Sequence, residues 1–162
     1  MIIVLQLIIY CAVFTLMVKL AAGNDPLNCL YFYPGPVQER VYELGLASRD
    51  AVRRKRMVFM IPFLLVMAVL LIVILGLWNR VSSFLQAYLQ SLLFLEVMNW
   101  YDGIVIDRLW VGHSRFWIIP GTEDIPFVRT WKQILVKRGI LSLIYVAVAA
   151  GTAGITVLIF RN

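Results

Sequence analysis

Charged residues are scarce in this sequence. They make up 15% of its 162 residues, whereas 62% are apolar. Soluble domains usually have about a quarter charged residues and about 45–50% apolar ones. These proportions exclude a disordered chain, a coiled coil and an ordinary soluble enzyme. The composition therefore predicts a membrane protein, and the length predicts one domain.

Cysteine and histidine are also scarce. The chain has two cysteines and one histidine, with no C-x-x-C pair and no Cys/His cluster, so zinc and iron–sulfur sites have no support. Cys11 lies in an apolar run and Cys29 in a segment expected to be cytoplasmic, so we expect no disulfide. Several carboxylates lie near the histidine in the sequence, but their spacing matches no known metal-binding pattern, so we predict no metal site. These residues are Asp102, Asp107, His113, Glu123 and Asp124. The sequence indicates no cofactor.

Motifs for nucleotide binding and hydrolysis are absent as well. The sequence contains no P-loop, GxGxxG, GxSxG or HExxH pattern. We therefore expect no nucleotide-driven transport by this chain alone, and no inverted repeats of the kind found in many transporters are evident. The formal net charge is +6. Because the basic residues flank apolar runs, we expect no nucleic-acid partner.

Long apolar runs dominate what is present. Residues 2–22, 57–78 and 140–160 contain a single charged residue, Lys19. Each run exceeds the roughly 18 residues that indicate a transmembrane helix. A fourth run, 81–106, is long enough but less apolar. It carries Gln86, Gln90, Glu96, Asn99 and Asp102.

These runs predict an all-α, polytopic membrane protein with four transmembrane helices in a single domain, 1–162. Backbone at membrane depth must be helical or form a closed barrel, and the runs lack the alternation of barrel strands. The first run has no basic start. We therefore expect it to be retained as a helix rather than cleaved as a signal peptide.

The basic residues predict the orientation of these helices. Loops 23–56 and 107–139 hold twelve lysines and arginines, whereas the opposite side has only Arg80 and Arg161. Basic loops stay in the cytoplasm, so we expect a multi-pass protein of the cell membrane with both termini extracytoplasmic and the lipid bilayer as a partner. The basic quartet 53–56 either anchors this topology or binds an anionic lipid.

Local patterns predict two helix starts within the loops. Ser48 fits an N-cap for a helix that continues through the basic quartet into the second run. Thr122, followed by two acids, fits another. From there we expect an amphipathic helix on the cytoplasmic membrane surface before the fourth span, with packing against loop 23–56 as the alternative. Its apolar side would be Phe127, Trp131, Ile134 and Leu135, and its basic side Arg129, Lys132, Lys137 and Arg138.

Small residues recur on the last run. Ala147 and Gly151 are four residues apart, as are Ala150 and Gly154. This spacing allows two helices to approach closely. It serves either packing within the chain or a homo-oligomer formed through Ala147, Gly151 and Gly154.

The third run carries a polar stripe. At about 100° per residue, Glu96, Asn99, Gly103 and Asp107 share a face about 80° wide, and Asp102 flanks it. Glu96 is about 15 Å from the helix end and so lies near the middle of the membrane. Such residues face the bundle interior or a water-filled cavity. We therefore expect Glu96 to be uncharged, hydrogen-bonded to Asn99 or a glutamine, or in contact with a ligand.

The stripe and the loop after it supply the candidate site. Glu96 and Asn99 would bind a ligand together with Asp102, Asp107, Arg108 and Arg115, the arginines holding a phosphate or a lipid headgroup. His113, with Asp102 or Asp107, could perform acid–base chemistry. Interhelical hydrogen bonding without further function is the alternative for the stripe.

Three functions are consistent with these features. The first is a membrane protein whose polar intramembrane cavity binds or translocates a small ligand, ion or proton. The second is a non-catalytic subunit or scaffold of a membrane complex, with the stripe docking a partner helix. The third is an intramembrane enzyme acting on a lipid or lipid-linked substrate. Whether the protein is an enzyme stays open at this stage.

Overall fold

A computed structural model describes residues 2–160, and within that range the regular structure is helical, with no strand. Arg161, counted above on the terminal side, lies outside the described residues. Five α-helices form the frame. They are α1 (Ile2–Ala22), α2 (Gly35–Glu43), α3 (Arg49–Val73), α4 (Phe84–Tyr101) and α5 (Trp131–Phe160). Four shorter helical segments complete it: η1 (Pro26–Phe32), η2 (Ile74–Trp78), η3 (Asp102–Val111) and η4 (Arg115–Trp117).

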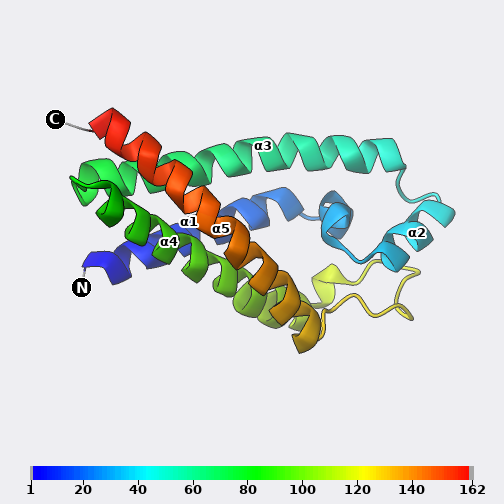
Figure 1. Cartoon of the computed structure of the whole chain (residues 1–162). Coiled ribbons are helices and arrows are strands. Elements are labelled where there is room, and N and C mark those ends of the chain that lie inside the picture. Colours follow the sequence, from blue (N-terminus) through cyan, green and yellow to red (C-terminus); the bar gives the residue numbers. More distant parts are fainter. Residues whose placement is uncertain (1, 161–162) are drawn as a thin grey trace.

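The four long helices pass back and forth along one direction (Figure 1). The start of α1, the turn between η2 and α4, and the end of α5 lie at one end of the molecule, and α2 and the segment 112–130 lie at the other. We call the second end the loop end. Helix α4 packs mainly against α5 and also contacts α1.

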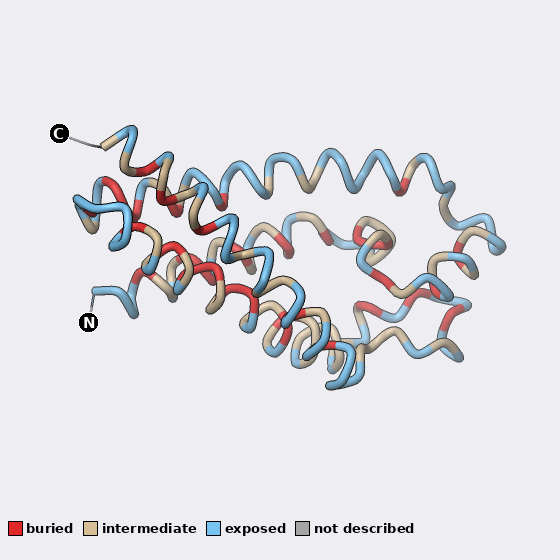
Figure 2. The backbone as a smooth tube through the Cα atoms, viewed as in Figure 1, coloured by how far each residue is buried: buried red, intermediate tan, exposed pale blue. Residues whose placement is uncertain are grey.

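Three of the four passes can cross a membrane by length and composition. They are Ile2–Ala22, Arg49–Trp78 and Trp131–Phe160. Their outer faces are apolar and exposed: Leu65, for example, is 63% exposed and Leu158 78%. Figure 2 shows this exposure along most of α3. So much exposed apolar surface is typical of a protein surrounded by lipid, and the structure is consistent with a multi-pass membrane protein.

The bundle core is aromatic and aliphatic. Tyr10 of α1 and Phe94 of α4 are buried and meet edge to face, with ring centroids 5.6 Å apart. Ala149 and Ala153 of α5 are fully buried in the same core. Small residues at these positions let α5 approach α4 closely.

Two passes end in π-helical segments, η2 after α3 and η3 after α4. In a π-helix each backbone hydrogen bond joins residues five apart, and such segments are frequent at functional sites. In η2, a Cβ atom on Gly76 would lie 2.1 Å from the Phe160 ring, so the glycine allows the end of α5 to pack there.

A second core joins the two loops at the loop end. Its buried members come from the end of α1, η1 and the residue after it, α2, the start of α3 and the segment after η3. The Tyr33 hydroxyl donates to the Trp117 carbonyl oxygen at 2.7 Å, which links the loops directly. The segment 112–130 therefore packs against loop 23–56. Of the apolar side chains expected on the amphipathic helix, Phe127 contacts this core, whereas Trp131 and Leu135 are exposed.

Two helix starts can be compared with the sequence. The prediction for Ser48 is confirmed, since its side chain accepts a hydrogen bond from the Ala51 amide and caps α3. The predicted start at Thr122 is wrong, because Thr122 forms a turn with Ile119 and residues 121–130 contain no helix. Pro126 interrupts the expected pattern.

The residues expected to form the amphipathic helix instead divide between the loop before α5 and the first part of α5. Thr130 and Gln133 form a capping box: the Thr130 hydroxyl accepts from the Gln133 amide at 3.4 Å, and the Gln133 side chain accepts from the Thr130 amide at 2.9 Å. From this cap α5 runs to Phe160 as one helix. No separate amphipathic helix precedes the fourth apolar run within residues 2–160.

Candidate functional site

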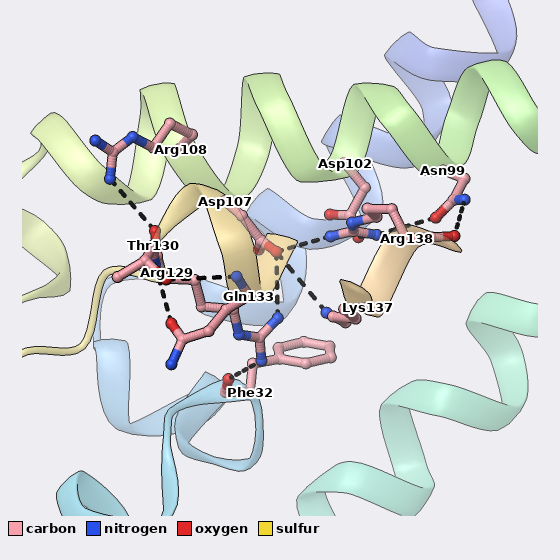
Figure 3. Close-up of polar contacts among 10 residues, drawn as sticks. All are labelled: Phe32, Asn99, Asp102, Asp107, Arg108, Arg129, Thr130, Gln133, Lys137 and Arg138. Atoms are coloured by element: carbon pink, nitrogen blue, oxygen red, sulfur yellow. Dashed lines mark hydrogen bonds and ion pairs between the residues drawn. The ribbon is translucent and has the colours of Figure 1, made fainter. Parts of the chain in front are cut away.

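A buried arginine joins α5 to the polar stripe. Arg138 is 2% exposed and lies between two aspartates of η3 (Figure 3). Its two terminal nitrogens contact different acids: Nη1 is 2.6 Å from Asp102 Oδ2 and Nη2 is 2.7 Å from Asp107 Oδ2. We call these three residues the ion triad.

The π-helix explains why both aspartates reach one guanidinium. In an α-helix, residues five apart point about 140° away from each other. In η3 the hydrogen bonds join residues five apart, which places Asp102 and Asp107 on the same face. Gly103 provides the space, because a Cβ atom there would lie 2.7 Å from Arg138 Nε. The flanking position predicted for Asp102 is therefore corrected.

Two further cations surround Asp107. Its Oδ2 atom is 3.3 Å from Arg129 Nη1 and 3.8 Å from Lys137 Nζ. Arg129 also donates to the Phe32 carbonyl oxygen at 3.4 Å, which ties η1 to the cluster. With the ion triad, these residues comprise two carboxylates and three cationic side chains, an excess of one positive charge.

A hydrogen-bonded chain leads from the ion triad into the bundle. Asn99 is 1% exposed, and its amide nitrogen donates to the Arg138 carbonyl oxygen at 3.1 Å and to Ser142 Oγ at 3.2 Å. Ser142 in turn donates to Glu96 Oε2 at 2.6 Å. The partner of Glu96 is therefore Ser142, rather than Asn99 or a glutamine as expected.

A cavity of about 150 Å³ opens beside the ion triad. Its polar side is formed by Asp102, Asp107, Arg129 and Lys137. Aromatic and aliphatic side chains form the other walls, among them Phe14, Val18, Met60, Ile106, Trp117 and Phe127. Glu96 and Asn99, expected to face a cavity, are not among the residues that line this one.

The wall at the loop end is buried and uncharged at neutral pH. Cys29 is 1% exposed, and burial raises the pKa of its thiol to about 11. Burial also raises the pKa of Tyr33 above its ordinary value. The indole nitrogen of Trp117 is buried and has no hydrogen-bond acceptor. Unpartnered donors of this kind are uncommon in protein interiors.

The remaining predicted residues lie outside the ion triad. Arg108 donates to the Arg129 carbonyl oxygen at 3.3 Å, and its guanidinium lies 5.4 Å from the Trp131 ring centroid. Arg115 is exposed in η4. His113 is exposed, and its Nδ1 contacts the carbonyl oxygens of Arg108 and Leu109 at 3.2 and 3.0 Å.

The structure brings Glu96, Asn99, Asp102 and Asp107 into one network, directly or through Ser142 and Arg138. Among the described residues, no hydrogen bond joins His113 to Asp102 or Asp107, so acid–base chemistry by these residues stays a prediction. Within residues 2–160, no three His, Cys, Asp or Glu side chains lie close enough together to hold a metal ion.

Sequence reasoning missed the basic half of the site. The sequence pattern predicts Arg129, Lys137 and Arg138 on a surface helix, and it does not single out Ser142 in the uncharged run 140–160. The capping box T-W-K-Q at 130–133 was the available signal, because it begins α5 early enough to place Arg138 beside η3. No known protein family, curated protein or solved structure matches this chain.

Proposed function

We propose that this protein is a membrane-embedded binding protein that holds a small amphiphilic ligand in the cavity beside the ion triad. The observation that carries the proposal is the lining of that cavity. Four charged side chains form one side, and mainly aromatic and aliphatic side chains form the rest. Binding sites that are mostly apolar with a few convergent polar groups are typical of small-molecule recognition.

The size of the cavity limits the ligand. A volume of about 150 Å³ is comparable with engineered protein cavities that bind benzene. The occupant is therefore a compact amphiphile of about six to eight non-hydrogen atoms, or the end of a longer one. Its apolar part would contact Phe14, Val18 and Met60, and its polar part would face Lys137 and Arg129.

We further propose that all four long passes cross the bilayer, with the loop end in the cytoplasm. Three observations support this placement: α1 starts and α5 ends at the same end of the molecule, the basic residues concentrate in the two loops, and the outer faces are apolar. The pass through α4 is more polar, but its acids are paired with Arg138 or Ser142. Intramembrane charges are tolerated when paired in this way.

Binding can be tested with three probes that share a six-carbon chain: hexanoate, hexanol and hexylammonium. The purified full chain is exposed to each probe, and ligand-observed NMR measures the dissociation constant. We expect at least one to bind. Val111 lines the cavity, so Val111→Phe, which fills part of it, should weaken binding by about tenfold or more. Val146→Phe, at a position 46% exposed on α5, is the matched control. Binding by none of the three contradicts the proposal.

A second candidate is a subunit of a membrane complex, and the outer face of α5 favours it. Ala147 and Gly151 are exposed, and a Cβ atom added at Gly151 or Gly154 would meet nothing within 4 Å. This face is free to pack against a partner helix or a second copy. Native mass spectrometry of the chain and its Gly151→Leu variant tests the idea. A monomeric wild type without co-purifying protein argues against it.

A further inference from the structure

The charges around the cavity differ in how fully they are neutralised. We propose that the ligand of this cavity is an anionic amphiphile, with a carboxylate or phosphate head between Lys137 and Arg129 and a short apolar body against α1 and α3. This inference rests on the binding function proposed above and specifies the ligand class. Three observations carry it: one concerns the two carboxylates, one the two cationic side chains of the cavity, and one the Trp117 indole.

The first observation is that both acids are already paired with one buried guanidinium. Arg138 contacts Asp102 Oδ2 at 2.6 Å and Asp107 Oδ2 at 2.7 Å, within the range of strong charge-assisted hydrogen bonds. Arg138 is also almost fully buried, so a ligand cannot readily replace it. A cationic head would have to compete with this guanidinium for both carboxylates.

The second observation is that the remaining cations are less tightly held. Lys137 Nζ is 3.8 Å from Asp107 Oδ2, and Arg129 Nη1 is 3.3 Å from the same atom. Both side chains line the cavity and are partly exposed, 40% and 28% respectively. With one positive charge in excess over the five residues, an added anion neutralises the cluster, and an added cation increases its imbalance.

The third observation is a donor without an acceptor in the cavity wall. Trp117 lines the cavity and is 3% exposed, and its indole N–H has no partner. A buried N–H is stabilised by any oxygen that accepts from it. Cys29, in the same wall, keeps its proton at neutral pH, so the wall adds no negative charge opposite the head.

The test compares the same three six-carbon probes on the unmodified full chain. We expect hexanoate to bind about tenfold or more tightly than hexanol or hexylammonium. Hexyl phosphate should bind as hexanoate does. On hexanoate binding, the indole N–H signal of Trp117, assigned by its loss in Trp117→Phe, should shift. Raising the salt from about 50 to about 500 mM should weaken hexanoate binding and leave hexanol binding unchanged.

Variants add a second line of evidence. Lys137→Gln should weaken hexanoate binding by about tenfold and leave hexanol binding within about twofold. Lys132→Gln, which removes an exposed charge outside this cavity, is the matched control. To identify the source of the anion, the same titration is made in nanodiscs of phosphatidylcholine and of phosphatidylglycerol. Weaker hexanoate binding in phosphatidylglycerol indicates that a lipid headgroup occupies the site, and equal binding indicates a free carboxylate or phosphate.

The outcomes separate this inference from the function it rests on. Equal affinity for the three charge types, or tightest binding of hexylammonium, overturns the anionic ligand while leaving the binding function intact. A salt-insensitive hexanoate affinity does the same. If no probe binds, both proposals fail.

Discussion

Gly103 of η3 and Arg138 of α5 share one small space. A Cβ atom on Gly103 would lie 2.7 Å from Arg138 Nε and 3.2 Å from Cγ and Cδ of the same side chain. Carbon and nitrogen atoms that are not bonded to each other do not approach so closely in ordinary packing. The absence of a side chain at position 103 is therefore what lets the guanidinium reach Asp102 and Asp107.

Gly103→Ala should consequently destabilise the protein. The new methyl group forces Arg138 to move, and overpacking of this kind costs about 1–3 kcal/mol. Gly139→Ala is the matched control, because a Cβ atom there meets nothing within 4 Å and alanine is the better helix former by about 0.5–1 kcal/mol. Thermal unfolding of the detergent-solubilised chain measures both. Equal effects of the two variants would show that the contact is unimportant.

Arg138→Gln should lower the unfolding free energy more than Gly103→Ala does. Arg138→Gln leaves two carboxylates without their central cation, and breaking a buried ion pair typically costs about 3–5 kcal/mol. The two aspartates differ in the cationic partners that they keep in this variant. Within residues 2–160, Asp102 has its ion pair with Arg138 alone, whereas Asp107 retains Arg129 and Lys137. We therefore expect the loss to come mainly from Asp102.

Double variants check this asymmetry. Adding Asp102→Asn to Arg138→Gln should recover about half or more of the lost unfolding free energy, because an amide needs no cation. Adding Asp107→Asn should recover less. Equal rescue by the two changes, measured by thermal unfolding, would contradict the assignment of partners.

The long helices could be predicted from the sequence because a long apolar run is visible without knowledge of the tertiary structure. Residues 2–22 match α1 to the residue, and the runs 57–78 and 140–160 lie within longer helical stretches. Helix starts were predicted where the cap is local, as at Ser48. At Thr122 the same reasoning failed, since an acidic turn resembles a helix start until Pro126 is taken into account.

The site could be predicted only in part. Asp102 and Asn99 were identified because a polar residue in an apolar run is conspicuous, and Asp107 because it continues the same helix face. The directions in which these side chains point could not be predicted, because a constant rotation of about 100° per residue does not describe the π-helical segment η3. Arg138 was missed because a charge at the edge of an apolar run looks the same whether it faces solvent or an aspartate on another helix.

Ser142 should stabilise the folded chain through its two hydrogen bonds. Its hydroxyl accepts from Asn99 and donates to Glu96, so Ser142→Ala removes two interhelical hydrogen bonds. Such bonds contribute about 0.6 kcal/mol on average in membrane proteins, and we expect a loss of about 1 kcal/mol.

Ser91→Ala is the control for that measurement. The Ser91 hydroxyl is buried on α4 without a partner, so its removal should be neutral or stabilising. Thermal unfolding of the two variants under identical conditions compares the same chemical change at both positions. A loss at Ser91 equal to that at Ser142 would mean that the network does not contribute to stability.

The rate at which the Cys29 thiol is alkylated should depend on pH in an unusual way. Burial raises its pKa from 9.0 to about 11, and only the thiolate reacts with alkylating agents. In a Cys11→Ala background, the iodoacetamide labelling rate of the folded chain should therefore still rise by about tenfold per unit between pH 8 and pH 10. An ordinary thiol levels off near pH 9. After unfolding in dodecyl sulfate the profile should revert to that of an ordinary thiol.

The same shift affects stability at alkaline pH. In the unfolded chain the thiol ionises above about pH 9, whereas in the folded chain it stays neutral up to about pH 11. The unfolding free energy should therefore fall as the pH rises through this interval, because ionisation favours the unfolded state. The decline should be smaller in Cys11→Ala/Cys29→Ala than in Cys11→Ala, since the buried tyrosines contribute equally to both. Identical declines in the two variants, together with a labelling rate that levels off near pH 9, would place Cys29 in contact with solvent.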